Sequence, residues 1–195
     1  IFLQVGWSRH PAPSAGRINS INYPKTYILL SIKIKNAPSL KQWEIFYLSF
    51  AGVGFLPKAP GTWGSLATLP LLWGLSALKF PNFLAIPFLI FVTAGTCYVT
   101  EVIQKKYDLH DPQWIVIDEV LGMLTTWLFM TNAPTWHLVI AFALFRFFDI
   151  VKIWPASWFD TKLKHGAGTI LDDIISGIYA GICYLLIEKF ILPLF

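Results

Sequence analysis

Charged residues are scarce in this sequence. Of its 195 residues, 13% are charged and 55% are hydrophobic, whereas about 25% of the residues in typical soluble domains are charged. This composition argues against the alternative of a soluble, all-helical protein. Sixteen Phe, nine Trp and seven Tyr fit a chain that is partly surrounded by lipid, because amphipathic aromatic rings favour membrane interfaces.

Cysteine and histidine are scarce as well. The two cysteines, Cys97 and Cys183, lie in apolar segments and indicate neither a disulfide framework nor a metal site. Neither is followed five residues later by an arginine, so cysteine-based phosphatase chemistry is disfavoured. The histidines are not clustered, which argues against zinc.

Basic residues exceed acidic ones, for a net charge of +4, but they do not form a stripe that would bind nucleic acid. Six of the fifteen precede Trp43. Lys105 and Lys106 follow the second apolar segment, and Lys152, Lys162 and Lys164 follow the fourth. By the positive-inside rule, the amino terminus and these two loops are predicted to face the cytoplasm.

The apolar segments predict an all-α, multi-pass integral membrane protein. A full crossing needs about 20 apolar residues. Several segments are short or contain Gly and Pro, so we expect about four or five hydrophobic helices, some of them tilted, shallow or re-entrant. The expected segments are 64–79, 83–103, 114–131, 136–148 and 173–192. We interpret residues 1–42 as an N-terminal extension outside the functional domain, which comprises residues 43–195.

Eight of the eleven acidic residues lie in three short segments. A carboxylate at membrane depth costs about 2.5 kcal/mol or more unless it is paired, solvated or bound to metal. Asp108, Asp111 and Asp160 are explained equally well as loop ends and helix N-termini. The remaining five are candidate catalytic and metal-binding residues: Asp118, Glu119, Asp149, Asp172 and Asp173.

Carboxylate oxygens are hard ligands of the kind that Mg²⁺ prefers. The adjacent acids Asp118 and Glu119, and likewise Asp172 and Asp173, would repel each other unless a cation offsets their charge. A divalent cation also binds and polarises phosphoryl oxygens. The acids therefore predict metal-assisted phosphate chemistry, although Asp172 has a second interpretation as the N-cap of the last helix.

The segment 52–65, GVGFLPKAPGTWGS, is rich in glycine and contains Lys58 and Thr62 at a predicted helix start. Backbone N–H groups at such a start favour anions. The segment lacks the spacing of a P-loop, and a simple turn before a membrane helix is the commoner explanation of such a pattern. Farther along, Arg146 and Lys152 are candidates for clamping a phosphate, or Arg146 neutralises Asp149 three residues later.

The chain resembles the phosphatidylglycerophosphatase A family. Four ordered motifs carry the resemblance: GVGFLPKAPGTWGSLATLP at 52–70, IVIDEVLGM at 115–123, FRFFDIVKIWP at 145–155 and HGAGTILDDIISG at 165–177. The chain departs from the family pattern at Ile153, where the family commonly has proline. It also departs at 165–168, where HGAG replaces a stretch that begins with paired glycines.

The resemblance implies a bacterial inner-membrane enzyme that uses Mg²⁺ to hydrolyse phosphatidylglycerophosphate to phosphatidylglycerol and phosphate. Its phospholipid substrate would lie in the bilayer and its active site would face the cytoplasm. By motif position, the five candidate acids look like the family's acidic residues, and its phosphate-binding residues correspond to Lys58, Thr62, Arg146 and Lys152. Water attack and an aspartyl-phosphate intermediate are both open, and the sequence does not predict the oligomeric state.

Two other classes of membrane protein also use intramembrane acids. An ion-coupled transporter would bind cations without hydrolysis, but the chain has short apolar segments and no detectable repeat. A CDP-alcohol transferase would also use acids and Mg²⁺, but the D-G-x-x-A-R arrangement is absent from the sequence.

Overall fold

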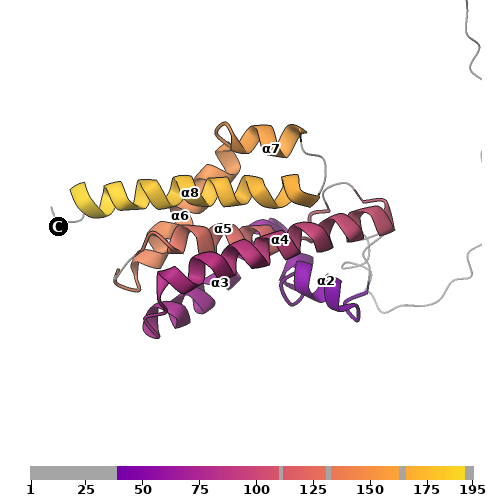
Figure 1. Cartoon of the computed structure of the whole chain (residues 1–195), viewed down its shortest axis with the longest axis horizontal. Helices are drawn as coiled ribbons and strands as arrows, with labels where there is room; N and C mark the ends of the chain where they lie inside the picture. Colours follow the sequence, from indigo (N-terminus) through magenta and orange to yellow (C-terminus); the bar gives the residue numbers. More distant parts are fainter. Residues whose placement is uncertain (1–38, 110–111, 131–132, 163–165, 192–195) are drawn as a thin grey trace, which may run out of the picture. The chain divides into compact units, whose positions relative to one another are not determined.

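The computed structural model describes residues 39–109, 112–130, 133–162 and 166–191, and these ranges contain helices and no strand (Figure 1). The predicted all-α class is therefore confirmed for them. Residues 38–195 belong to one compact unit. In chain order the elements are α2 (Trp43–Leu48), η1 (Val53–Phe55), α3 (Pro60–Ala77), α4 (Asn82–Tyr107), α5 (Ile117–Trp127), α6 (His137–Val151), α7 (Ala156–Lys162) and α8 (Gly166–Phe190).

Two of these helices, α4 and α8, are long and apolar enough to cross a membrane. Only four of the 26 residues of α4 are buried within the protein, so most of its apolar side chains face outward. The other three expected segments correspond to α3, α5 and α6, which do not meet the same length and composition test. The part of the chain that the structure describes therefore contains two candidate membrane spans, and the larger number of crossings stays a prediction.

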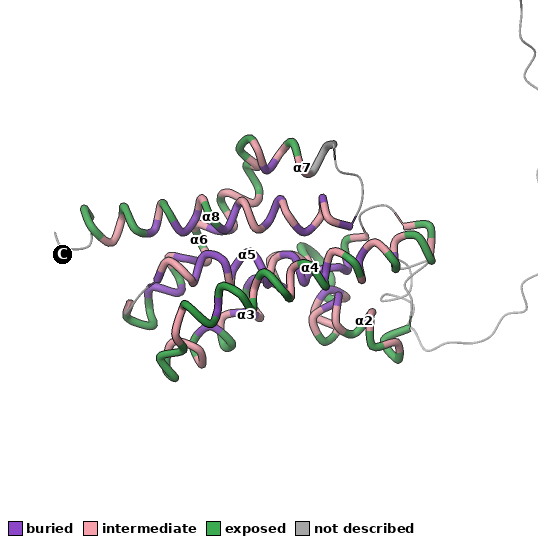
Figure 2. Tube along the Cα trace, viewed as in Figure 1, coloured by how far each residue is buried: buried purple, intermediate pink, exposed green. Residues whose placement is uncertain are grey.

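Helix α5 forms the centre of the unit. It has 11 residues, of which nine are buried, and Figure 2 shows this burial along most of the helix. The helix packs on α8, α3 and α6. The apolar segment expected at 114–131 is longer than this helix, which begins only at Ile117. The residue before it, Val116, donates its N–H to the Leu48 carbonyl (3.0 Å) instead of to a helical partner. At about 1.5 Å per residue, such a helix is about half as long as a hydrocarbon core is thick.

Helices α5 and α8 cross where each has a glycine. A Cβ atom on Gly177 would collide with the Gly122 carbonyl oxygen, and one on Gly122 would meet the Phe145 ring and the Asp173 carbonyl oxygen. The Thr126 hydroxyl, one turn after Gly122, lies within hydrogen-bonding distance of the Gly177 carbonyl (3.2 Å). The backbones of α5 and α8 are therefore so close at Gly122 and Gly177 that a side chain at either position would clash.

Helix α8 begins seven residues earlier than the sequence predicted, at Gly166 rather than Asp173. Glycine has low helix propensity, but tertiary packing overrides it here. Gly166 lies so close to the backbone of α4 at Cys97 and Glu101 that a Cβ atom would clash with it. The earlier start places Asp172 in the second turn of α8, so its interpretation as an N-cap is wrong.

We expect Gly177→Ala to destabilise the protein, because the added Cβ atom forces α5 and α8 apart. Overpacking of this kind typically costs about 1–3 kcal/mol. Thermal unfolding of the purified protein in detergent would measure the change. Gly95→Ala is the matched control, since a Cβ atom at Gly95 of α4 meets no other atom within 4 Å and alanine favours the helix. Equal unfolding temperatures for the two variants would contradict the close crossing.

Candidate active site

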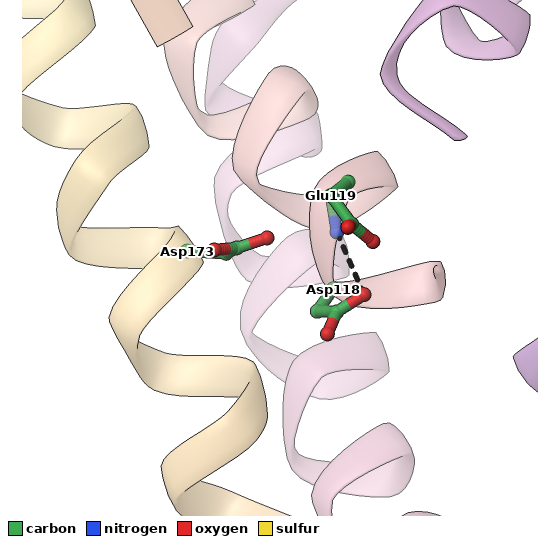
Figure 3. Close-up of side chains that lie close together, drawn as sticks. All are labelled: Asp118, Glu119 and Asp173. Carbon is green, nitrogen blue, oxygen red and sulfur yellow. Dashed lines mark hydrogen bonds between the residues drawn. The ribbon is translucent and has the colours of Figure 1, made fainter. Parts of the chain in front are cut away.

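Three carboxylates from two helices converge beside the α5–α8 crossing. Asp118 and Glu119 occupy the first turn of α5, and Figure 3 shows Asp173 extending from α8 toward them. One carboxylate oxygen of each residue lies within 4.8 Å of the other two. The Glu119 backbone N–H donates a hydrogen bond to Asp118 Oδ1 at 3.0 Å, which fixes the Asp118 side chain. We call these three residues the acid cluster.

The acid cluster is enclosed by the protein. Asp118 and Asp173 are 7% and 5% exposed, so their negative charges are poorly screened and repel one another strongly. The N-terminus of α5 offers partial positive charge to Asp118 and Glu119. Within the described residues, Glu119 Oε2 is buried and has no hydrogen-bond partner.

These observations fit a divalent cation. Carboxylates are hard oxygen ligands, and Glu119 Oε2, which accepts no hydrogen bond from the described residues, could coordinate a metal ion. A cation would also offset the repulsion among the three carboxylates. The acid cluster can therefore hold a metal ion. Among the described residues, the ligand atoms that converge here are all carboxylate oxygens, which are hard ligands.

The other two predicted acids pair with basic side chains. Asp149 Oδ2 lies 2.6 Å from Arg146 Nη1 within α6, and Asp172 Oδ2 lies 2.7 Å from Lys152 Nζ. Asp149 is close enough to the acid cluster for its charge to act on Glu119 and Asp173. The five predicted acids therefore fall into two groups. Three converge in the acid cluster, and the other two lie beside it, each in an ion pair with a basic side chain.

The glycine-rich segment also reaches this region. Pro60 begins α3, and a Cβ atom on Gly61 would meet the Glu119 carboxylate and Arg146. Ser65, one turn later on α3, lies 3.4 Å from Arg146 Nη1 through its hydroxyl oxygen. Gly61 and Ser65 were not among the predicted site residues. Their spacing of four residues at a helix start is the signal that could have found them.

Lys58 and Ala59, which lead into α3, have left-handed backbone conformations with φ of 62° and 47°. Such a conformation costs about 1 kcal/mol or more for a residue other than glycine. Lys58 is exposed, and Thr62 is partly buried in the first turn of α3. The predicted contacts of Lys58 and Thr62 with phosphate remain predictions.

All the helix ends that carry these residues lie together. Helices α3 and α5 begin near the acid cluster, α6 ends beside it, and α8 begins about two turns before Asp173. The start of α8 packs on the last third of α4, at Glu101, shortly before Lys105 and Lys106. The start of α8, about two turns before Asp173, therefore adjoins the last part of α4.

Comparison with known proteins decides the family. The model of the phosphatidylglycerophosphatase A family matches residues 46–188. The chain belongs to the phosphatidylglycerophosphatase A family. Phosphatidylglycerophosphatase A of Haemophilus influenzae is 38% identical over 142 residues, which cover 72% of this chain and 86% of that protein. Phosphatidylglycerophosphatase A of Escherichia coli is 36% identical over 149 residues, 73% of this chain and 81% of that protein.

A third relative carries a different name. A putative phosphatidylinositol-3-phosphatase of Bacteroides thetaiotaomicron is 32% identical over 147 residues, which cover 66% of this chain and 83% of that protein. No solved structure matches the chain. The match to phosphatidylglycerophosphatase A confirms the family and the class of enzyme, a phosphatase, that the four motifs predicted.

Magnesium should stabilise the protein through the acid cluster. At a Mg²⁺ concentration about 100 times the dissociation constant, binding to the folded state alone adds about 2.7 kcal/mol. We therefore expect Mg²⁺ to raise the thermal unfolding temperature of the wild type relative to EDTA, and Asp173→Asn to abolish that rise. In EDTA the variant should be at least as stable as the wild type, because one repelling charge is gone.

Glu101→Gln is the control for this measurement, since Glu101 is an acid of α4 that pairs with Lys105 (2.6 Å) outside the cluster. It should keep the full response to Mg²⁺. An undiminished response in Asp173→Asn would show that the cation binds elsewhere.

Proposed function

We propose that this chain hydrolyses phosphatidylglycerophosphate to phosphatidylglycerol and inorganic phosphate, and that the reaction depends on Mg²⁺. The observation that supports this most directly is the convergence of Asp118, Glu119 and Asp173 in a member of the phosphatidylglycerophosphatase A family. The curated relatives from two bacteria carry the name of this activity. The buried acids supply the metal ligands that a phosphate monoester hydrolase of this kind needs.

Each group of side chains has a separate part in this proposal. Asp118, Glu119 and Asp173 hold Mg²⁺, which when bound supplies charge to polarise a phosphoryl oxygen. Arg146 and Lys152, which border the acid cluster, bring positive charge toward the phosphoryl oxygens. Lys58 and Thr62 are assigned to the phosphate side as well, at the start of α3.

The overall reaction requires one bond to form and one to break. The oxygen of water becomes bonded to phosphorus, the ester bond between phosphorus and the glycerol oxygen breaks, and that oxygen leaves with a proton as the alcohol of phosphatidylglycerol. A carboxylate of the site either takes the proton from the attacking water or first accepts the phosphoryl group itself. Both routes use the same carboxylates and give the same products.

Hydrolysis by the purified protein tests this proposal. We expect the wild type to release phosphate from phosphatidylglycerophosphate with Mg²⁺ and to be inactive in EDTA. Asp118→Asn and Asp173→Asn should each lower the rate by about a hundredfold or more, because lost metal coordination removes several kcal/mol of transition-state stabilisation. Glu101→Gln should retain the wild-type rate. Near-normal rates in both cluster variants would refute the assignment of the acid cluster.

The same assay should include phosphatidylinositol 3-phosphate, because one relative is named a putative phosphatidylinositol-3-phosphatase. We expect faster hydrolysis of phosphatidylglycerophosphate, in line with the two more similar relatives. The opposite preference would assign the chain to the inositol lipid and leave the site unchanged.

We further propose that the protein lies in the bacterial cytoplasmic membrane with its acid cluster at the cytoplasmic side. Two candidate spans, α4 and α8, support membrane association. Lys105 and Lys106 end α4 at the side of the helical unit where α8 begins, about two turns before Asp173. Because short cytoplasmic loops are enriched in Lys and Arg, this side is the one expected to remain in the cytoplasm.

Cysteine labelling tests this orientation. In a variant with both native cysteines replaced by serine, Asp108→Cys marks the end of α4 and Phe80→Cys marks the loop before its start. We expect a membrane-impermeant maleimide to label position 80 in intact cells and position 108 only after the membrane is opened. The reverse pattern would invert the proposed orientation.

A further inference from the structure

The buried carboxylate of Asp172, beside the acid cluster, forms an ion pair with the partly exposed side chain of Lys152. Lys152 Nζ donates a hydrogen bond to Asp172 Oδ2 at 2.7 Å. The Asp172 side chain is 4% exposed, whereas that of Lys152 is 31% exposed. A carboxylate with so little access to water needs a cationic partner. One member of the pair, Asp172, therefore lies inside the protein, and the other, Lys152, is partly accessible from outside.

The local backbone fixes the position of Lys152. This residue follows the last residue of α6 and has a left-handed conformation with φ of 44°. Its N–H donates to the Phe148 carbonyl at 2.9 Å and thereby ends the helix. The Ser176 hydroxyl, one turn after Asp172 on α8, lies 3.5 Å from the same carbonyl oxygen. Two positions on one face of α8 thus contact the end of α6.

Asp172 and Asp173 have different surroundings although they are adjacent. Asp173 belongs to the acid cluster and faces α5, whereas Asp172 contacts the residue that ends α6. The charge of Asp172 still acts on Asp173. The Lys152 ammonium group is therefore paired with Asp172, which directly precedes a member of the acid cluster in the sequence.

We propose that Asp172 is a positioning residue rather than a metal ligand. It holds the Lys152 ammonium group at the edge of the acid cluster, where that group binds the phosphate of a lipid phosphate monoester. An ammonium group carries three N–H donors, so a bond to Asp172 is compatible with a second bond to a phosphoryl oxygen. Lysine is also a common phosphate ligand in proteins. This inference rests on the proposed function and refines how the substrate is recognised.

The pair has a simpler alternative, in which it only ties the end of α6 to α8. The two roles predict different kinetics. A structural tie affects stability in every variant that breaks it, whereas a phosphate-binding lysine affects the Michaelis constant for the lipid without changing metal affinity. Asp172 as a metal ligand makes a third prediction, the loss of metal binding.

The test compares Asp172→Asn, Lys152→Gln, their double variant and Lys152→Arg in the full-length protein. Hydrolysis of phosphatidylglycerophosphate in detergent micelles gives KM and kcat, and Mn²⁺ binding is measured separately by electron paramagnetic resonance. We expect each single neutral variant to raise KM by about tenfold or more, with a smaller change in kcat and with Mn²⁺ affinity close to that of the wild type. Lys152→Arg should keep most of the affinity for the lipid.

The double variant measures the coupling between the two residues. If Asp172 acts through Lys152, the double variant should be no worse than Lys152→Gln alone, because its partner is already absent. Lys105→Gln is the matched control, since it breaks the comparable Lys105–Glu101 pair (2.6 Å) on the exposed side of α4. It should leave both KM and Mn²⁺ binding unchanged.

Several results would overturn the inference. Loss of Mn²⁺ binding in Asp172→Asn would make Asp172 a metal ligand. An unchanged KM with a lower unfolding temperature in Lys152→Gln would leave the pair a structural tie, and this variant decides the matter if Asp172→Asn does not fold. Additive effects in the double variant would exclude positioning. A wild type that binds Mn²⁺ but does not hydrolyse phosphatidylglycerophosphate would instead overturn the proposed function.

Discussion

Electrostatic repulsion among three buried carboxylates is the constraint around which this end of the protein is organised. Asp118, Glu119 and Asp173 would separate if their backbones were free to move, yet packing holds an oxygen of each within 4.8 Å of the others. The positive end of α5 offsets part of the repulsion. Two basic side chains, Arg146 and Lys152, lie at the border of the cluster and are each paired with a further acid. A divalent cation completes this balance in the proposed function.

Much of the fold could be predicted from apolar segments and their boundaries. The expected segments 64–79 and 83–103 correspond closely to α3 and α4, because Pro60 begins α3 and the connection at 78–81, which contains a turn, separates it from α4. The extent of α8 was predicted less well. Its first turns are rich in glycine and look like a loop, but they are helical and pack closely on the α4 backbone. The shortness of α5 was not apparent from the sequence for a related reason, since the apolar residues before it, Trp114–Val116, are buried in a turn and an irregular segment.

The candidate site shows the same division between local and tertiary information. The pairing of Arg146 with Asp149 follows from a spacing of three residues on one helix and was one of two predicted roles. The pairing of Lys152 with Asp172 joins residues 20 positions apart on different helices, so no local pattern reveals it. The sequence therefore indicated five candidate acids but could not distinguish those that converge from those that pair with a basic side chain. The resemblance to the family supplied a function but not this division of roles.

The glycine crossing of α5 and α8 has a consequence for how such a protein can diverge. Gly122 lies one turn after Asp118 and Glu119, and Gly177 one turn after Asp173, so this close contact between the two helices adjoins all three carboxylates. A larger residue at Gly122 would press on the Asp173 backbone, and one at Gly177 would displace the α5 backbone one turn after Asp118 and Glu119. Substitutions at the two positions are therefore tolerated only together with compensating changes, and drift at this crossing should be slower than on the outward face of α4. Which residues can occur at these two glycine positions therefore depends on the carboxylates one turn away, although neither glycine has a side chain that takes part in the chemistry.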